Sequence, residues 1–281
     1  MRFPPDLLRM VVYLLTGPED AKKVIGTGFF LAVPMPRNGA PHRALYLVTA
    51  KHVADELGAT FWMQANLHEG GTRLARGECT QWIYHPDKDD DNRIDVAALL
   101  VREHDLAVNF FAPNPDFVVD DPSKFGISLG DEAVIIGHFG LLPGKVRNTP
   151  LARLGTVAMF PDDKVRVVYP DKEIREVYAY LLEVHSLSGM SGCPVFVHQV
   201  FTVTDGFGRP TANRVGEVRL LGLMTGHWPV PEEDKKKLGA SGHELNLGIS
   251  LVAPGRHILE TIMRKEALIE RDEWLDEFLK R

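Results

Sequence analysis

Short apolar segments recur along most of the chain, and each is bounded by glycine, proline, asparagine or aspartate. Segments of this kind, rich in β-branched and aromatic residues, are typical of β-strands. About six of them lie on either side of a proline-rich connector near residues 112–124. The first group is VVYLL, GTGFFLAV, ALYLVTA, ATFWMQANL, RGECTQWIY and DVAALLV, and the second is DEAVIIGHF, ARLGTVAMF, KVRVVY, VYAYLLEV, CPVFVHQVFTV, VRLLGLMTG and NLGISLV. Because no helical periods separate the strands, the pattern favours barrels or a sandwich over βαβ units.

The last segment of the chain has a different period. In PGRHILETIMRKEALIERDEWLDEFLKR the apolar residues recur at roughly helical spacing, and Pro254 suits a helix start. The residues of this stripe are Ile258, Ile262, Leu268, Leu275 and Leu279, with Ile269, Trp274 and Phe278 nearby. We expect one amphipathic helix over 254–281 that either docks on a barrel or contacts a partner or a second copy of the chain.

Composition narrows the functional classes. The 281 residues are 44% hydrophobic and 25% charged, as in an ordinary globular protein. A net charge of −6 and the lack of a dense Lys/Arg block argue against nucleic-acid binding, and no apolar run is long enough to span a membrane. The N-terminal stretch predicts a first strand rather than a signal peptide, and Cys79 and Cys193 are expected to stay reduced. We therefore expect a cytoplasmic protein.

Three polar residues stand at the ends of expected strands. Ser191 lies between glycines in SLSGMSGCPVF, which predicts either a simple tight turn or a nucleophile with unobstructed backbone N–H groups. His52 follows the strand ALYLVTA and opens one or two helical turns. Asp95 directly precedes the apolar run VAALLV, so its carboxylate needs a hydrogen-bond partner, and a histidine Nδ1–H would be one. Serine catalysis requires such a base and a carboxylate that holds it.

With these segments in this order, the chain resembles the chymotrypsin-like serine peptidases, particularly their bacterial high-temperature-requirement branch. The resemblance covers about Val11 to Ile258 and is carried by GTGFFLAV…YLVTAKHV, WIYHPDKDDDNRIDVAALLV, GDEAVIIGHF, SGMSGCPVF, RLLGLMTGHW and NLGISLVAPGRHI. It implies an all-β fold of two packed six-stranded antiparallel β-barrels followed by a C-terminal α-helix. The expected domains are residues 1–115 with His52 and Asp95, residues 116–253 with Ser191, and the helix of residues 254–281.

The resemblance also implies an activity, that of a serine endopeptidase acting on protein or peptide substrates through an acyl-enzyme, without a metal or an organic cofactor. The roles would be Ser191 as nucleophile, His52 as general base and Asp95 as its partner. The N–H groups of Gly189 and Ser191 would form the oxyanion hole. The remaining substrate-binding residues would be His185 at the primary pocket and Met224, Thr225 and Gly226 as an edge for the bound peptide.

The chain departs from the family pattern at several positions. Met190 replaces an aspartate that pairs with a new N-terminus in digestive members, so activation by that route is not expected. Cys193 replaces a usual glycine, and His185 stands where an aspartate would select Lys or Arg. Only the terminal helix follows the peptidase region, so no peptide-binding domain is expected. These departures leave an alternative open, a catalytically weak or inactive module that binds or regulates.

Overall fold

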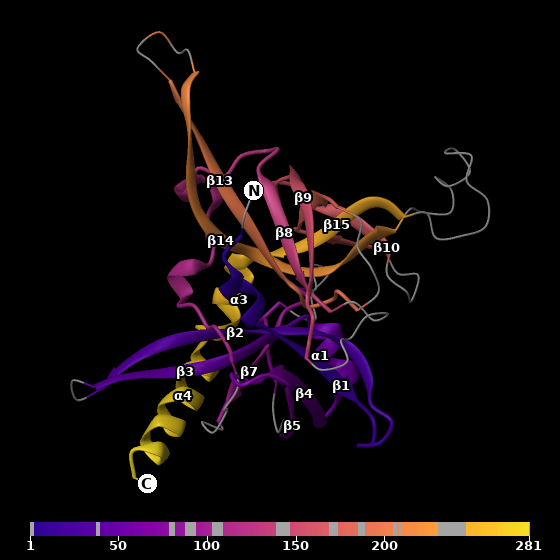
Figure 1. Ribbon diagram of the computed structural model, residues 1–281, viewed down its shortest axis with the longest axis vertical. Helices are drawn as coiled ribbons and strands as arrows, with labels where there is room; N and C mark the ends of the chain where they lie inside the picture. Colours follow the sequence, from indigo (N-terminus) through magenta and orange to yellow (C-terminus); the bar gives the residue numbers. More distant parts are fainter. Residues whose placement is uncertain are drawn as a thin grey trace.

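The computed structural model describes residues 3–37, 40–78, 82–87, 94–102, 109–138, 147–168, 174–184, 189–204, 207, 210–229 and 246–280. Two β units are stacked along the long axis of the molecule, and the C-terminal helices run down one side of the lower unit (Figure 1). The predicted all-β fold class with a helical C-terminal region is confirmed.

The lower unit is a seven-stranded antiparallel sheet with the order β5-β4-β1-β2-β3-β7-β6. The two end strands of this order, β5 and β6, contain the two ends of the segment RGECTQWIY, which the sequence predicted as one strand. At one end of the segment β5 pairs with β4, and at the other end β6 pairs with β7. The elements are β1 (Val11–Thr16), β2 (Lys23–Arg37), β3 (Ala40–Thr49), α1 (Lys51–Leu57), β4 (Thr60–Asn66), β5 (Thr72–Glu78), β6 (Ile83–Tyr84) and β7 (Ala97–Val101).

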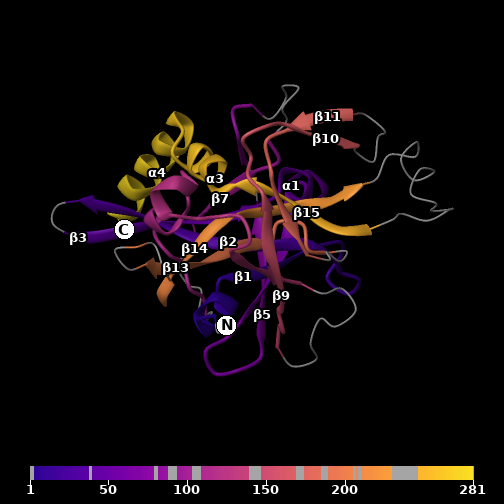
Figure 2. The ribbon, with the colours of Figure 1, turned by 90° about the horizontal axis from the view of Figure 1, so that it is seen from above.

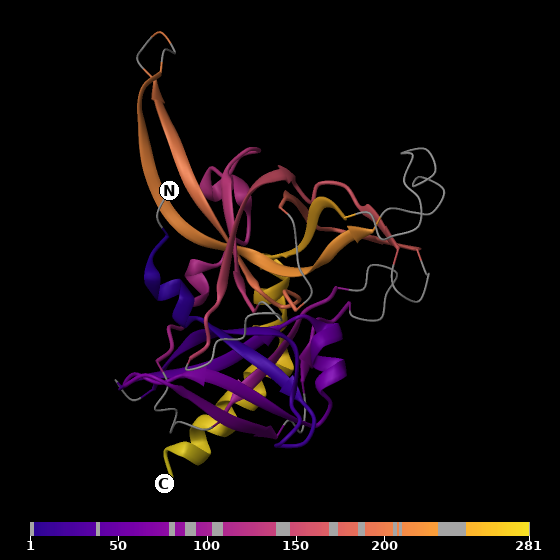
Figure 3. The ribbon, with the colours of Figure 1, turned by 45° about the vertical axis from the view of Figure 1, so that its right-hand side comes forward.

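The upper unit is a closed antiparallel barrel with the order β12-β15-β14-β13-β8-β9, which confirms the predicted second barrel. A separate ribbon of β10 and β11 lies beside it (Figure 2). The hairpin of β13 and β14 extends well beyond the barrel (Figure 3). The strands are β8 (Glu132–Gly137), β9 (Leu151–Met159), β10 (Val165–Val168), β11 (Ile174–Val177), β12 (Tyr180–Glu183), β13 (Pro194–Thr204), β14 (Pro210–Pro229) and β15 (Asn246–Pro254).

The two units are joined by apolar packing, and the barrel has a further hydrophobic cluster of its own. A single cluster of buried apolar residues joins Phe29 and Leu47 of the lower sheet to Phe196 and Leu223 of the barrel. Three short 3₁₀ turns lie in the described part of the chain. The turn η1 (Pro5–Arg9) precedes β1, and the expected proline-rich connector contains η2 (Pro115–Phe117) and η3 (Pro122–Phe125). A continuous apolar junction holds the two units in one arrangement, and the candidate residues meet across it.

The C-terminal region differs from the single helix that was predicted. It forms α3 (Gly255–Ile262) and α4 (Lys265–Phe278), and the chain is extended at Arg264 between them. The guanidinium of Arg264 donates to the Tyr84 carbonyl at 2.6 Å, a bond that the break makes room for. Because the break changes the phase of the helix, α4 buries only part of the predicted stripe, Leu275 with the neighbouring Trp274. The exposed members are Leu268, Ile269, Phe278 and Leu279, and the buried face of α4 is Ala267, Arg271, Trp274 and Leu275.

Within the described residues, no helix combines the length and the apolar character needed to cross a membrane.

Candidate active site

His52 lies in the first turn of α1, directly after β3, as the segment YLVTAKHV predicted. The first N–H groups of a helix have no partner within it, and Ala50 at the N-cap offers no side-chain acceptor. The backbone N–H of His52 donates instead to Oδ1 of Asp95 at 2.9 Å. Asp95 therefore caps α1 from the non-strand segment directly before β7, and this bond fixes the backbone of the histidine.

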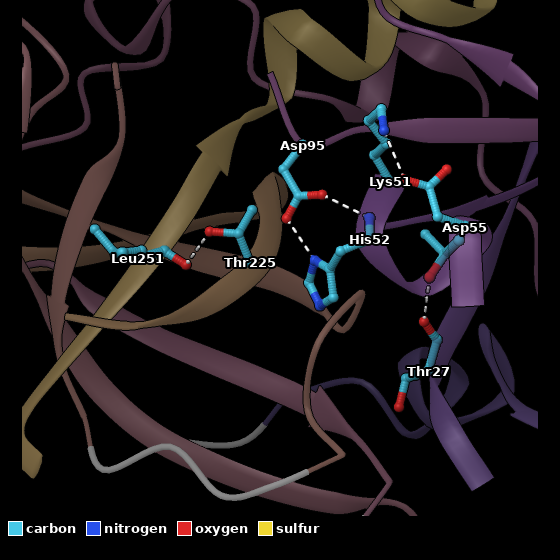
Figure 4. A network of polar contacts seen from close by, with 8 residues as sticks. Thr27, Lys51, His52, Asp55, Asp95, Thr225 and Leu251 are labelled. Carbon is cyan, nitrogen blue, oxygen red and sulfur yellow. Dashed lines mark hydrogen bonds and ion pairs between the residues drawn. The ribbon is translucent and has the colours of Figure 1, made fainter. Parts of the chain in front are cut away.

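The same carboxylate binds the imidazole. Nδ1 of His52 lies 2.7 Å from Oδ2 of Asp95, and the second ring nitrogen faces away from the carboxylate (Figure 4). The Asp95 side chain is 14% exposed and that of His52 is 48% exposed. Because a carboxylate only accepts, Nδ1 carries the proton and Nε2 is left as the base. Burial lowers the pKa of His52, but the charge and hydrogen bond of Asp95 outweigh burial and raise this pKa above its usual value.

Ser191 belongs to the loop of residues 189–193, which we call the serine loop. The N–H of Thr27 on β2 donates to the Ser191 carbonyl at 3.0 Å, and Thr27 Oγ1 donates to the Gly189 carbonyl at 3.4 Å. A Cβ added at Gly26 would meet Val53 at 2.9 Å and the Ser191 carbonyl at 3.0 Å. The Ser191 backbone is thus seated beside the residue that follows His52, so the fold brings the three predicted residues to one place.

Two glycines give the serine loop its shape. Gly189 has φ +90° and Gly192 has φ +81°, values in the left-handed region that other residues rarely adopt. The N–H of Cys193 donates to the Met190 carbonyl at 3.1 Å and closes a turn around Ser191. The N–H groups of Gly189 and Ser191 donate to no partner in the described part of the chain. Both N–H groups are therefore available to donate hydrogen bonds to an oxygen that gains negative charge, as the predicted oxyanion hole requires.

Met190 and Cys193 are fully buried members of the barrel core. Met190 anchors the loop by apolar packing. Cys193 fits because Gly137 faces it: a Cβ on Gly137 would overlap Cys193 Sγ. Burial raises the pKa of the Cys193 thiol to about 12, so this thiol stays protonated and unreactive at neutral pH. Cys193 therefore stands where the resemblance implied a glycine without crowding the loop, because Gly137 has no side chain.

The expected substrate edge lies on β14 beside the serine loop. Met224 uses both backbone groups there: its carbonyl accepts from Gly192 N–H at 2.8 Å and its N–H donates to the Cys193 carbonyl at 2.9 Å. Strand β13 begins at Pro194, opposite Leu223, so β14 continues past it from Thr225 onward. A Cβ at Gly226 would meet nothing within 4 Å. At Thr225 and Gly226 the edge of β14 is therefore not covered by β13, whereas Met224 supports the serine loop.

Two further expectations concern the Ser191 hydroxyl and the residues His185 and Cys79. Ser191 Oγ makes no hydrogen bond to His52 or to any other described residue. His185 and Cys79 lie outside the described residues, and so does the proposed pocket position that His185 would occupy.

Sequence reasoning missed two residues that hold the site. Thr27 binds the serine loop through its N–H and Oγ1, accepts the His138 N–H at 2.9 Å through the same oxygen, and is fully buried. Gly137 provides the space for Cys193. The only signal for Thr27 was a threonine between two glycines in a strand, and the signal for Gly137 was a glycine inside an apolar strand, which indicates a close approach.

Comparisons with known proteins give limited similarity. No protein-family model and no curated protein matches the sequence. The Rv3671c protease in its inactive form is 16% identical, with 91% of this chain and 88% of that chain covered and a TM-score of 0.47. The active form of the Rv3671c protease from M. tuberculosis is 16% identical, with 91% and 80% covered and a TM-score of 0.44. Human heparin binding protein is 12% identical, with 92% and 91% covered and a TM-score of 0.48.

Proposed function

We propose that this protein is a serine endopeptidase in which Ser191, His52 and Asp95 act as a catalytic triad. The observation that carries the proposal is the bond from His52 Nδ1 to Asp95 at 2.7 Å, together with the seating of the serine loop on Thr27. The bond fixes the tautomer that leaves Nε2 basic, and the seating places Ser191 beside the start of α1. The order of these residues along the chain resembles that of the chymotrypsin-like peptidases.

In this mechanism Ser191 Oγ attacks the carbonyl carbon of a peptide bond while His52 Nε2 takes the hydroxyl proton. The carbonyl oxygen becomes an oxyanion that accepts hydrogen bonds from the N–H groups of Gly189 and Ser191. His52 then gives its proton to the departing amine, and an acyl-enzyme ester remains on Ser191. Water, deprotonated by His52, hydrolyses the ester by the same steps. Asp95 stays ionised throughout and stabilises the imidazolium.

We further propose that the substrate is an extended peptide that adds a strand beside Thr225 and Gly226. Main-chain hydrogen bonds to an open strand edge bind many sequences, and the side-chain pocket then decides where cleavage occurs. A histidine at position 185 carries no permanent negative charge, so we expect cleavage after apolar or uncharged polar residues rather than after Lys or Arg. We propose the cytoplasm of a bacterium as the location, where a free thiol such as that of Cys193 stays reduced.

Two observations favour the alternative, a binding or regulatory module with little turnover. Ser191 Oγ has no hydrogen bond to His52, and Met190 cannot form the ion pair that orders the loop in digestive relatives. Catalytic hydrogen bonds are often long in substrate-free enzymes and tighten when the substrate binds, so the first observation does not exclude turnover. The two functions differ in one measurable respect, which is whether peptide bonds are cut.

The test is cleavage profiling of a peptide library by the wild-type chain, with Ser191→Ala as the blank and Ser188→Ala as the matched control in the same segment. We expect new termini with the wild type and with Ser188→Ala, and a loss on the order of 10⁶ in turnover with Ser191→Ala. Equal cleavage by Ser191→Ala would contradict the proposed nucleophile. Absence of cleavage by a folded wild type would favour the binding module, and dominant cleavage after Lys or Arg would contradict the pocket assignment.

A further inference from the structure

A buried polar cluster joins the C-terminal helix α3 to the lower sheet. Glu260 Oε2 accepts two hydrogen bonds, from His85 Nε2 at 2.9 Å and from His257 Nδ1 at 2.8 Å. Both histidine side chains are almost fully buried, and Glu260 is half exposed. The two rings contact each other edge to face, with centroids 5.1 Å apart. Burying two imidazoles is costly unless their polar atoms are bonded, so the carboxylate is the group that makes this junction stable.

Two histidines and a glutamate also suit a transition metal, since their candidate ligand atoms lie within 4.8 Å of one another. The second nitrogen of His85 argues against that use. A metal-binding histidine normally donates its other N–H to an acceptor. His85 Nδ1 instead accepts the N–H of Asp87 at 3.1 Å, which places the histidine proton on Nε2, the atom that faces Glu260. The cluster is therefore a hydrogen-bond junction in which His85 and His257 donate to an ionised Glu260.

The charges of the cluster agree with this assignment. Hydrogen bonds from His257 and His85 lower the pKa of Glu260 to about 2, so Glu260 is ionised at neutral pH. Burial lowers the pKa of His257 despite the neighbouring carboxylate, so that histidine is neutral. His257 Nε2 is buried without a partner and would be an unsatisfied donor if it were protonated.

This junction leads directly to Asp95. The segment of residues 83–87 runs alongside residues 94–98: Tyr84 pairs with Ala97, the His85 N–H donates to the Val96 carbonyl at 3.3 Å, and the Ile94 N–H donates to the Asp87 carbonyl at 3.3 Å. Asp95 therefore lies between two residues whose backbones are bonded to this segment. Glu260 holds the segment at His85, and Arg264 holds it at the Tyr84 carbonyl.

We propose that Glu260 is a positioning residue for Asp95, acting through His85 and the backbone of residues 83–87, so that docking of α3 sets the geometry of the His52–Asp95 pair. As a statement about catalysis this rests on the proposed function, but its structural part does not. The C-terminal helices are then part of the active-site support rather than only a cover for the lower sheet. Asp95 is displaced when the junction opens, and His52 loses both the cap on its N–H and the bond to its Nδ1.

The experiment compares Glu260→Leu with Glu260→Gln and with Glu277→Leu, a matched substitution of an exposed glutamate on α4. Nitrogen-15-labelled histidine is followed by NMR to obtain the pKa of His52 and the low-field signal of its Nδ1 proton. Because Asp95 raises this pKa, we expect Glu260→Leu to lower it and to weaken the proton signal. Glu260→Gln keeps an acceptor oxygen and should restore most of both, and Glu277→Leu should change neither. These readouts need no peptidase activity, so they stand even if the wild type cuts nothing.

For an active wild type, we expect Glu260→Leu to reduce kcat roughly 10- to 100-fold with little change in KM, because catalytic geometry rather than substrate binding is disturbed. Circular dichroism and a denaturation curve establish that the variant is folded. An unchanged His52 pKa and proton signal in folded Glu260→Leu would overturn the proposal. Tight binding of Zn²⁺ alone to the wild type, lost in Glu260→Leu, would also overturn it by assigning the cluster to a metal.

Discussion

The two halves of the candidate site are held in different ways. On the lower sheet, side chains fix the geometry: Asp95 bonds both the backbone N–H and the Nδ1 of His52, and the junction at Glu260 supports the segment beside Asp95. On the barrel, the serine loop is held through its backbone carbonyl and N–H groups by Thr27 and Met224, and Met190 anchors it by apolar packing. The Ser191 hydroxyl itself has no partner among the described residues.

Under the proposed function, this difference indicates which half of the site already has its catalytic geometry. A charge-assisted bond between two side chains is short and directional, so the pair of His52 and Asp95 is set before a substrate arrives. Backbone bonds place the Ser191 main chain but leave the rotation of its hydroxyl open. The last adjustment of the site is thus expected on the barrel side, when a peptide adds along β14.

Asp95→Asn should disrupt the His52–Asp95 pair on the lower sheet. Of the variants that compare the two halves of the site, it should cause the largest loss of kcat. The amide no longer favours the Nδ1–H tautomer, and a loss of about 10⁴ in kcat is expected from the same change in the chymotrypsin family, which is the known reference case. The measurement is kcat for a substrate found by library profiling. A rate within a few-fold of wild type would remove Asp95 from the mechanism.

The same variant carries a pH signature. Asp95 raises the pKa of His52, and activity is lost as the pH falls through that pKa because Nε2 becomes protonated. Removing the carboxylate charge lowers the pKa, so the acid limb of the residual activity should move to lower pH. A limb that stays in place or moves to higher pH would contradict the assigned cause.

Gly137→Ala should affect the barrel half of the site mainly by lowering the free energy of unfolding. The new methyl overlaps Cys193 Sγ, and overpacking of this kind costs about 1–3 kcal/mol. The paired variant Gly137→Ala with Cys193→Ala removes the sulfur and should recover most of that loss. Urea denaturation of both variants measures the difference. Equal destabilisation of the single and double variants would show that Cys193 is not the residue that Gly137 accommodates.

Thr27→Val should have the smallest effect of these variants, and it should affect the barrel half of the site without affecting the His52–Asp95 pair. It removes the oxygen that binds the Gly189 carbonyl and leaves the buried His138 N–H without an acceptor, a cost of about 1–2 kcal/mol. We expect a lower kcat with an unchanged His52 pKa, because the lower half does not depend on Thr27 Oγ1. Thr27→Ser keeps the oxygen and is the control. A shifted His52 pKa in Thr27→Val would show that the halves are coupled.

The features that could be predicted from the sequence are those that depend on the local pattern of apolar and turn residues. The strands and their order follow from apolar runs and turn residues, and His52 and Asp95 were found because each stands at a strand end. The break at Arg264 was not predictable, since it is stabilised by the Tyr84 carbonyl far away in the chain. The same holds for the junction at Glu260, whose partner His85 is 175 residues distant, and for the fit of Cys193 against Gly137. Interactions of this kind depend on the packed fold and leave no periodic signal in the sequence.

The most direct test of the central claim is labelling with a fluorophosphonate probe, followed by mass spectrometry of the modified peptide. The probe reacts with a serine only when a neighbouring base activates it. The wild type should be labelled at Ser191 alone, and both His52→Ala and Ser191→Ala should remain unlabelled while keeping their fold. Labelling at another residue, or equal labelling of His52→Ala, would contradict a site built from Ser191 and the His52–Asp95 pair.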